Sequence, residues 1–374
     1  MNSYGIYIHI PFCNSKCYYC DFTSFPLKEN KEIATYINLL TKEIEIYTKN
    51  KSIKEINTIY FGGGTPSILT PFFIEQMLNK IFKNFKIKKE TEITLECNPE
   101  NLTFEYLKDI KKAGINRVST GIQTFNNHIL KTIGRRADRK AILKAMEYLF
   151  KSDIKNISID LMYGLPYQKK EEFLSEVEFI LKTEVKHISM YALHLDKRTP
   201  LYRIYQKNPE IFPDEETIRE MYLEAREKII KKGFIHYEIS NFALKGYECR
   251  HNLKYWEMKN YIGFGVSAVS FENRFRRKNT SSLHNYLKLL KKEIIPVIYA
   301  EKVEGIKLLN EKLMLGLRLI RGVKKSEIKK ILEKKKYIIK NYKKEGFIVE
   351  TQDYIRLTPE GIIISNRIIS DLMI

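Results

Sequence analysis

Short runs of apolar and β-branched residues alternate with longer amphipathic stretches through the first 240 residues. The apolar runs cover residues 4–10, 56–61, 92–97, 117–122, 157–162 and 187–193. The amphipathic stretches cover residues 30–49, 71–84, 103–113, 138–151, 170–183 and 215–232. This alternation predicts a parallel sheet with right-handed helical crossovers. Six such units predict an α/β fold, namely a partial, TIM-like parallel barrel.

The alternation stops after residue 233. A strand-like run at 234–240 is followed by Cys249-Arg-His-Asn-Leu-Lys-Tyr-Trp256 and by a glycine-spaced apolar run at 262–271. Beyond them the pattern is helix (305–318), helix (325–332), helix (337–345), a hairpin around 351–353 and a last helix after 361, an order that resembles a winged helix. We therefore expect three parts: a barrel over 1–240, an irregular antiparallel extension over 241–304, and a helical, winged-helix-like domain over 305–374.

Polar and glycine residues follow the predicted strands where the strands end. In a parallel barrel these ends share one rim, which is where barrel enzymes place their reactive loops. The segments are a cysteine loop after the first strand, Gly62-Gly63-Gly64-Thr65-Pro66 after the second, Glu96-Cys97-Asn98-Pro99 after the third, Gly121-Ile122-Gln123 after the fourth, and Asp160 with Gly164-Leu165-Pro166 near the fifth. We expect a functional site on this rim.

Three cysteines, Cys13, Cys17 and Cys20, are spaced C-x3-C-x2-C after the first predicted strand. Thiolates this close together suit a soft metal centre, and three of them leave one iron of a four-iron cluster without a protein ligand. A zinc site completed by His9 or Asp21 is one alternative, and a purely apolar role for the cysteines is another.

A disulfide framework fits the cysteines less well, because their number in the cluster is odd. The start of the chain, Met-Asn-Ser-Tyr, also lacks the features of a signal peptide. These observations predict a reducing cytoplasm. Cys97 and Cys249 have no neighbouring cysteine, and we expect both to be inert.

The rim residues together describe a pocket for a zwitterionic nucleoside. Glu96 and Asp160 offer acceptors for ribose hydroxyls or an ammonium group. Gln123 adds an amide, and Arg135 adds a fork for a carboxylate. The glycine triplet lets a ligand approach the backbone closely, although a tight turn alone would also explain it.

The net charge of +20, from 65 basic and 45 acidic residues, adds little to this picture. Lysine-rich solvated helix faces explain much of it. An anionic ligand, anionic lipid or nucleic acid would also fit, and peripheral contact with the inner face of the plasma membrane is compatible with the charge. No segment is apolar enough to span a bilayer, and monomer and homodimer both stay open.

Four segments together carry a family resemblance: Tyr7-Ile-His-Ile-Pro-Phe-Cys13 with the cysteine spacing, Gly62-Gly-Gly-Thr-Pro66, Gly121-Ile-Gln-Thr-Phe-Asn126 and Asp160-Leu-Met-Tyr-Gly-Leu-Pro166. In this order and spacing they resemble the radical S-adenosylmethionine enzymes of the oxygen-independent coproporphyrinogen oxidase branch. The resemblance implies that the three cysteines hold a [4Fe-4S] cluster. It also implies that S-adenosylmethionine chelates the fourth iron through its amino and carboxylate groups.

The resemblance assigns cofactor contacts residue by residue. Arg135 is expected on the methionyl carboxylate, and Asp160 or Gln123 on the ribose. The full set of implied contacts is Tyr7, Gly63, Gly64, Thr65, Glu96, Gln123, Arg135, Asp160 and, by a backbone contact, Leu193.

Two departures point to a subgroup of that branch. The decarboxylating enzymes carry a fourth cysteine two positions after the third and a long extension before the tyrosine, whereas this chain has Phe22 and only six residues before Tyr7. The segment His251-Asn-Leu-Lys-Tyr-Trp256 instead resembles the HNxxYW signature of the heme chaperones. This resemblance implies heme binding and heme transfer to acceptor hemoproteins such as respiratory ones.

The residues of this segment permit two interpretations. The His251 imidazole would suit heme iron, with Asn252 beside it, Tyr255 and Trp256 as flat apolar surfaces, and Arg250 or Lys254 for the propionates. Alternatively, a capped helix packs two aromatic side chains into the core. The rival functions are radical decarboxylation of coproporphyrinogen III and, more remotely, nucleic-acid binding by the winged unit. Whether S-adenosylmethionine is cleaved stays open.

Overall fold

The computed structural model describes residues 3–27, 29–49 and 52–374. Six strands pair in parallel, each with the next in the chain. They are β1 (Tyr4–Ile10), β4 (Glu55–Gly63), β5 (Lys86–Cys97), β6 (Arg117–Gln123), β7 (Asn156–Tyr163) and β8 (His187–Ala192). The predicted α/β fold with six βα units is confirmed.

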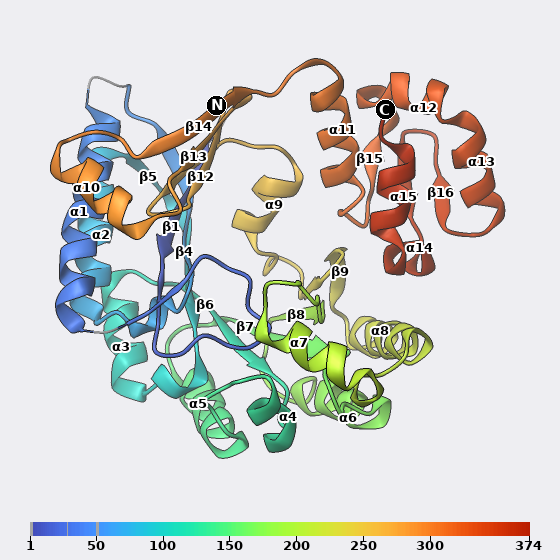
Figure 1. The fold of residues 1–374 in the computed structure, drawn as a ribbon, viewed down its shortest axis with the longest axis horizontal. Helices are drawn as coiled ribbons and strands as arrows, with labels where there is room; N and C mark the ends of the chain where they lie inside the picture. Colours follow the sequence, from blue (N-terminus) through green and yellow to red (C-terminus); the bar gives the residue numbers. More distant parts are fainter. Residues whose placement is uncertain (1–2, 28, 50–51) are drawn as a thin grey trace.

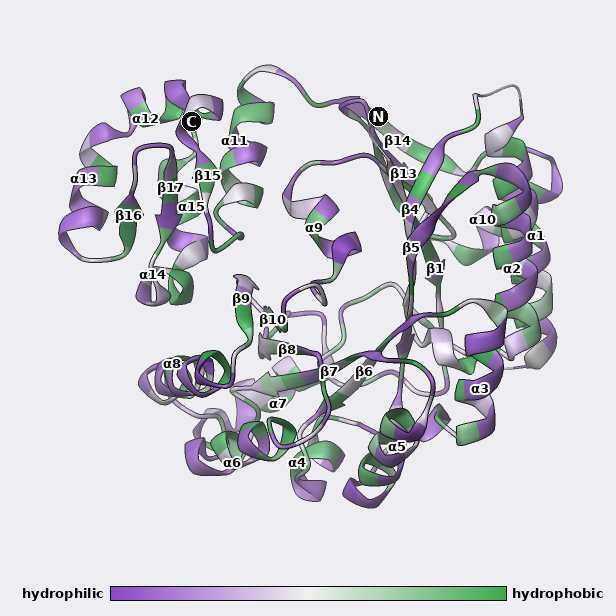
Figure 2. Ribbon diagram, turned by 180° about the vertical axis from the view of Figure 1, so that it is seen from behind, coloured by the Kyte–Doolittle hydropathy of each residue, from purple (hydrophilic) through white to green (hydrophobic). Residues whose placement is uncertain are grey.

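The helices that follow these six strands cover one side of the curved sheet (Figure 1). They are α1 (Asn30–Thr48), α2 (Pro71–Asn84), α3 (Phe104–Ala113), α5 (Arg139–Lys151), α6 (Lys170–Ile180) and α8 (Glu215–Lys231). Ile6, Ile8 and Ile10 of β1 are fully buried in the same apolar core as Ile37 and Leu40 of α1. Hydrophobic and hydrophilic positions alternate along these helices (Figure 2), as one-sided burial requires.

The other face of the sheet is polar. Because successive side chains of a strand point to opposite faces, Tyr7 lies opposite the isoleucines of β1. The pairing register places Tyr7 beside Tyr60, Tyr60 beside Thr94, and Thr94 beside Arg117. A row of polar side chains therefore crosses the inner face, where an apolar core would otherwise be expected.

The sheet continues beyond both edges of the parallel part. At one edge, β10 (Asn241–Ala243) and β9 (Ile235–Glu238) add in antiparallel fashion to β8. At the other, β11 (Tyr261–Phe264) runs parallel to β1, and β12 (Val269–Glu272), β13 (Phe275–Asn279) and β14 (Val297–Lys302) follow antiparallel. The extension is thus not antiparallel throughout. The chain passes from β10 to β11 through the helix α9 (Arg250–Trp256), and this crossover lets β11 run parallel to β1 at the other edge. β14 and β9 form opposite edges, so the barrel is partial.

The C-terminal lobe contains α11 (Gly305–Gly316), α12 (Lys329–Lys334), α13 (Lys336–Lys344), α14 (Pro359–Ile363), α15 (Ser365–Leu372) and the strands β15 (Val323–Lys324), β16 (Ile348–Glu350) and β17 (Tyr354–Leu357). The expected hairpin is present as β16 and β17. Backbone hydrogen bonds from Ile239 N to Arg318 O (2.9 Å) and from Ile320 N to Tyr237 O (3.2 Å) attach the lobe to the barrel.

The remaining elements are short. The predicted helix at 325–332 divides into a 3-10 turn and α12, and the pattern did not predict α4 (Asn127–Thr132), α7 (Pro200–Lys207) or α10 (Leu283–Lys291). The last pieces are β2 (Phe12–Cys13), β3 (Phe25–Pro26) and 3-10 turns at Pro66–Ile68, Pro99–Asn101, Pro209–Ile211 and Lys325–Glu327. Among the helices of residues 3–27, 29–49 and 52–374, none combines the length and the apolar character needed to cross a membrane.

Candidate cofactor site

The cysteine loop leaves the end of β1 and is anchored at both of its ends. Short parallel pairing of β2 with β3 closes the loop, with Leu27 N donating to Cys13 O at 2.9 Å. The middle of the loop is tied to the segment after α4, because Tyr18 N donates to Ile133 O at 2.9 Å. The backbone therefore holds the cysteines at the rim, where the sequence placed them.

Two of the thiols face neighbours that suit a thiolate. Thr65 Oγ1 donates to Cys13 Sγ at 3.4 Å, and Arg135 Nη1 donates to Cys17 Sγ at 3.7 Å. Burial raises the pKa of the Cys13 and Cys20 thiols, so bound metal would be needed to hold them deprotonated. Within the described residues no three His, Cys, Asp or Glu side chains gather closely enough to hold one ion. A four-iron cluster has a separate iron for each cysteine, so it does not require such a gathering.

The glycine turn after β4 brings the chain against this loop. Gly64 N donates to Ile10 O at 2.7 Å, and Thr65 N donates to Phe12 O at 2.8 Å. A Cβ at Gly64 would lie 2.7 Å from Phe12 O and 3.0 Å from Cys13 Sγ. Because these two amides already donate hydrogen bonds, the turn does not offer them to a ligand. Its glycine instead lets the backbone approach the cysteine loop closely.

Two half-buried carboxylates belong to the parallel strands, Glu96 near the end of β5 and Asp160 within β7. Glu96 accepts hydrogen bonds from Tyr60 Oη at 2.7 Å and from Gly63 N at 3.2 Å. Burial, with some help from the Asp160 carboxylate, raises the pKa of Glu96 to about 7. Burial also raises the pKa of Asp160, which accepts from Ser119 Oγ at 3.1 Å and Ser158 Oγ at 3.2 Å. A cation or a hydroxyl donor beside these groups would favour their ionised form.

Arg135 carries an unused donor. Its Nη2 donates to Gly121 O at 2.6 Å and its Nη1 to Asn98 Oδ1 at 3.3 Å. Its Nε is buried and has no hydrogen-bond partner in the described part of the chain. An orphaned guanidinium donor beside the cysteines fits a carboxylate ligand.

Gln123 adopts a left-handed backbone (φ 73°) at an irregularity of β6, a conformation uncommon outside glycine.

Five of the nine predicted contacts line two pockets, whereas Gly64, Gln123, Asp160 and Leu193 line neither. Cys17, Thr65 and Arg135 line one. Tyr7, Gly63 and Glu96 line the other, a cavity of about 380 Å³ whose lining is Tyr7, His9, Phe22, Thr23, Gly63, Glu96, Tyr255, Tyr261, Ser267, Ala268 and Val269. The glycine turn contributes to both, with Thr65 in the first pocket and Gly63 in the second. The first pocket is only about 10 Å³, so most of the space for a ligand is in the second.

Leu193 and His9, one of the zinc candidates, are held by contacts of their own. Leu193 N donates to Tyr163 O at 2.9 Å, and its side chain packs on a small apolar cluster around Met162 and Leu165. His9 Nδ1 is 3.0 Å from Tyr7 Oη, and His9 Nε2 is 2.9 Å from Thr23 O. Both ring nitrogens of His9 are thus engaged on the inner face.

The HNxxYW segment forms α9, which lies against the inner face of the sheet. His251 is 0% exposed; its Nδ1 is 2.9 Å from Thr58 Oγ1 and its Nε2 is 2.8 Å from Tyr255 Oη. Burial, with Lys254 and Arg117 nearby, lowers the pKa of His251 to about 3. The ring is therefore neutral, and in this arrangement it would have to leave both partners before binding iron.

The other residues of the segment connect α9 to its surroundings. Trp256 lies under the Arg318 guanidinium of the C-terminal lobe, 5.4 Å from the ring centre, and Asn252 is half-buried. Burial raises the pKa of Cys249 to about 12, as expected of an inert thiol.

Two inner-face residues were not predicted. Glu92 is 4% exposed and accepts from the backbone N of Arg250 and of His251, both at 3.1 Å. Arg117 is 2% exposed, and its Nε has no partner among the described residues. Both occupy alternate strand positions that bear polar side chains, so the two-residue period was the available signal.

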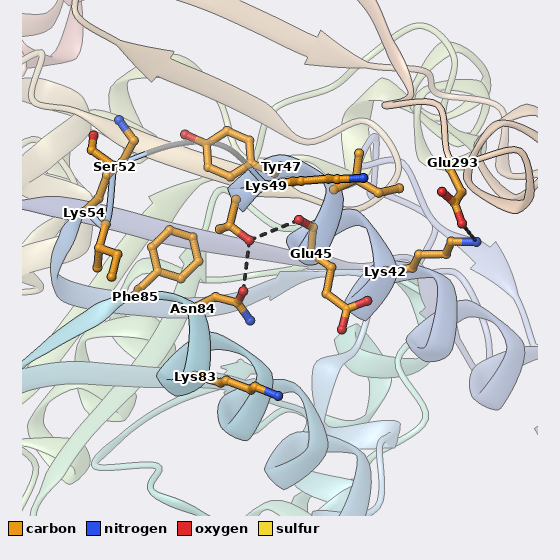
Figure 3. A pocket seen from close by; sticks show the side chains of 13 residues that line it. Lys42, Glu45, Tyr47, Lys49, Ser52, Lys54, Lys83, Asn84, Phe85 and Glu293 are labelled. Carbon is orange, nitrogen blue, oxygen red and sulfur yellow. Dashed lines mark hydrogen bonds and ion pairs between the residues drawn. The ribbon is translucent and has the colours of Figure 1, made fainter.

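A third cavity, of about 490 Å³, lies on the outside of the barrel between the ends of α1 and α2 (Figure 3). Lys42, Lys49, Lys54 and Lys83 line it, and Lys42 pairs with Glu293 at 3.1 Å. None of the predicted site residues belongs to it.

Comparisons with known proteins agree with this architecture. Residues 7–180 match the radical SAM superfamily, and residues 304–364 match the HemN C-terminal domain. Heme chaperone HemW of Lactococcus lactis subsp. lactis is 36% identical over 319 residues, which cover 85% of this chain and 82% of that protein. Heme chaperone HemW of Bacillus subtilis is 32% identical over 371 residues, 97% of each.

Among solved structures, coproporphyrinogen III oxidase (HemN) from Escherichia coli, described as a radical SAM enzyme, superposes with a TM-score of 0.85. It is 19% identical, and the match covers 100% of this chain and 90% of that one. At this identity the likeness concerns the fold alone. The two heme chaperones are 36% and 32% identical in sequence over 85% and 97% of this chain, which establishes the family. This chain belongs to the HemW family of radical SAM proteins.

Proposed function

We propose that this protein binds heme and transfers it to acceptor hemoproteins, and that it carries a [4Fe-4S] cluster and S-adenosylmethionine in its barrel. The match to heme chaperones over 97% of the chain carries this proposal. The absence of a fourth cysteine at Phe22, which is 66% exposed, speaks against coproporphyrinogen oxidase chemistry. Reduced protein given S-adenosylmethionine should therefore leave coproporphyrinogen III unchanged.

The residues of the rim fit the two cofactors of the radical SAM superfamily. Cys13, Cys17 and Cys20 would hold the cluster, which supplies an open iron and an electron when bound. Arg135 would then meet the methionyl carboxylate through its orphaned Nε, and Glu96 would face the ammonium group. Asp160 and Gln123 are proposed for the ribose, and the Leu193 backbone for a further contact.

We propose that heme docks against α9. A cavity of about 610 Å³ lies between α9 and the start of β1 and β4, where Ser3 and Asn57 line it. From α9 and the residues after it, the lining adds the cations Arg250, Lys254 and Lys259, the apolar Leu253 and Met258, and also Glu257 and Asn260. Cations beside apolar side chains suit a porphyrin with its propionates. Ligation by His251, with Asn252, Tyr255 and Trp256 around the ring, would require the imidazole to leave Thr58 and Tyr255.

The experiment is an absorption titration of the anaerobically reconstituted chain with heme. We expect a stoichiometric Soret complex, and a chain that binds no heme would overturn the proposal. In Arg250→Ala/Lys254→Ala the complex should weaken. Loss of the complex in His251→Ala, with iron content and fold retained, would assign His251 as the ligand.

Further assignments are proposals of the same kind. We propose that the acceptors are respiratory hemoproteins and that the protein is cytoplasmic. We also propose peripheral contact with the inner leaflet of the membrane, and the lysines around the outer cavity support this contact (Figure 3). We also propose the division into 1–240, 241–304 and 305–374, which the HemN C-terminal match at 304–364 supports. Monomer and homodimer both stay compatible with these assignments, and no nucleic-acid partner is proposed.

The affinity for S-adenosylmethionine should depend on pH through Glu96. Its pKa of about 7 means that below neutral pH the carboxyl is protonated, so binding an ammonium group there must first displace a proton. We expect affinity to fall about fivefold as pH drops from about 7 to about 6, and to rise by no more than about twofold above 7. Equilibrium dialysis across this range measures it.

Two variants make the pH measurement specific. Glu96→Gln should bind more weakly and with a flatter profile. Glu238→Gln removes a buried carboxylate whose pKa is likewise raised to about 7, but one that lies at the β9 edge and outside the cavity lining. A Glu96→Gln profile as steep as that of the unmodified protein would contradict the assignment.

A further inference from the structure

α9 closes the cofactor cavity from the N-terminal end of the strands. It lies between the inner face of the sheet and the C-terminal lobe (Figure 1). We propose that His251 is a positioning residue for the S-adenosylmethionine pocket, because its ring forms the floor on which Tyr7, Tyr60 and Tyr255 rest. This role rests on the proposed binding of S-adenosylmethionine and does not depend on heme.

The floor is fixed from below by Glu92. This carboxylate accepts from the backbone N of Arg250 and of His251, both at 3.1 Å, and so satisfies two of the free amides at the start of α9. Lys254 Nζ adds a hydrogen bond to Ser3 O at 3.0 Å. The helix is therefore tied to β5 and to the residue before β1, and its register against the sheet is determined.

Close packing fixes the ring itself. A Cβ at Gly5 would lie 3.2 Å from His251 Cε1 and 2.9 Å from Lys254 Cδ, so β1 approaches α9 at a position without a side chain. Thr58 Oγ1 and Tyr255 Oη hold the two ring nitrogens at 2.9 and 2.8 Å. A buried ring with both nitrogens engaged has one orientation.

The upper face of the ring supports the cavity wall. The His251 and Tyr60 rings stack with centres 5.1 Å apart at 26°, and Tyr7 lies 6.5 Å away. Tyr60 Oη in turn donates to Glu96 Oε1 at 2.7 Å. Tyr7, Glu96 and Tyr255 all line the 380 Å³ cavity. His251 thus acts on the pocket through three aromatic neighbours, without lining the cavity.

A matched control exists at the other edge of the sheet. His236 is 7% exposed, accepts from Arg226 Nε at 3.2 Å, contacts Ile239 O at 3.2 Å through Nε2 and stacks on Phe242 with ring centres 4.2 Å apart. Like His251 it is buried, has both ring nitrogens engaged and stacks on an aromatic ring, but it is not part of the cavity lining. Removing it reports the general cost of losing a core histidine.

The test uses the full chain with its reconstituted cluster and no heme. The dissociation constant for S-adenosylmethionine is measured by equilibrium dialysis, and the change in the EPR signal of the reduced cluster on adding S-adenosylmethionine is the spectroscopic readout. We expect His251→Ala to weaken binding about tenfold and to diminish that change while iron content stays constant. His251→Gln, which keeps a donor and an acceptor, should recover part of the affinity.

His236→Ala should lower the melting temperature yet bind S-adenosylmethionine within about twofold of the unmodified protein. Tyr255→Phe, which removes one hydroxyl and keeps the ring, serves if His251→Ala does not fold, and we expect it to weaken binding about threefold. The inference is overturned if the folded His251 or Tyr255 variant binds S-adenosylmethionine like the unmodified protein, or if His236→Ala weakens binding as much. Because the test contains no heme, these results can be interpreted even if the heme titration fails.

Discussion

Alanine at Cys13, Cys17 or Cys20 is expected to remove most of the iron and sulfide from the anaerobically reconstituted protein. Three thiolates are the whole protein ligand set that the loop offers, so each substitution leaves a second iron without a protein ligand. The hydrogen bonds from Thr65 to Cys13 and from Arg135 to Cys17 cannot substitute for a metal–sulfur bond. Iron and sulfide analysis of each purified variant gives the result.

The two remaining cysteines provide the controls. Cys97 and Cys249 are buried, and burial raises the pKa of both thiols. Alanine at either position should leave the iron content unchanged. If one of the three loop variants kept full iron and sulfide while folded, the cluster assignment would be wrong.

The second large effect is expected for Gly64→Ala. The new Cβ would lie 2.7 Å from Phe12 O and 3.0 Å from Cys13 Sγ, and neither atom belongs to the flexible end of a side chain. The cysteine loop must therefore move away from the glycine turn. We expect loss of S-adenosylmethionine binding and a reduced iron content, measured by equilibrium dialysis and iron analysis.

Gly246→Ala separates this steric effect from backbone strain. Gly246 has a φ of +88° but nothing within 4 Å of its Cβ position, so its substitution should cost only about 1–2 kcal/mol of stability and leave both cofactors bound. Unchanged cofactor binding by Gly64→Ala would show that the two pockets do not depend on close approach of the turn.

The six strands and the rim residues could be predicted because both depend on local pattern. Strand ends of a parallel sheet share an edge, so Gly64, Glu96 and Asp160 could be grouped without knowing any contact. Arg135, on the loop after the fourth strand, needed the resemblance. The short helices α4 and α7 were not predicted, because a segment of six to eight residues contains too few repeats of the helical hydrophobic period.

The inner floor of the barrel could not be predicted, because its contacts join residues far apart in the chain. His251 N meets Glu92 across 159 positions, and His251 Nδ1 meets Thr58 across 193. In sequence, a histidine followed by two aromatics fits a ligand and a core equally well. Only the parallel addition of β11 beside β1 carries α9 into the barrel.

Transfer of heme to an acceptor is the direct test of a heme chaperone function. The reconstituted chain is loaded with heme, freed of excess, and mixed with an apo-hemoprotein of respiratory type, and the absorption spectrum is followed until the acceptor is filled. Heme bound to serum albumin, which has no chaperone role, is the parallel donor. The acceptor should gain heme from this chain faster than from albumin, whereas equal rates, or heme that never leaves the chain, would contradict a chaperone function.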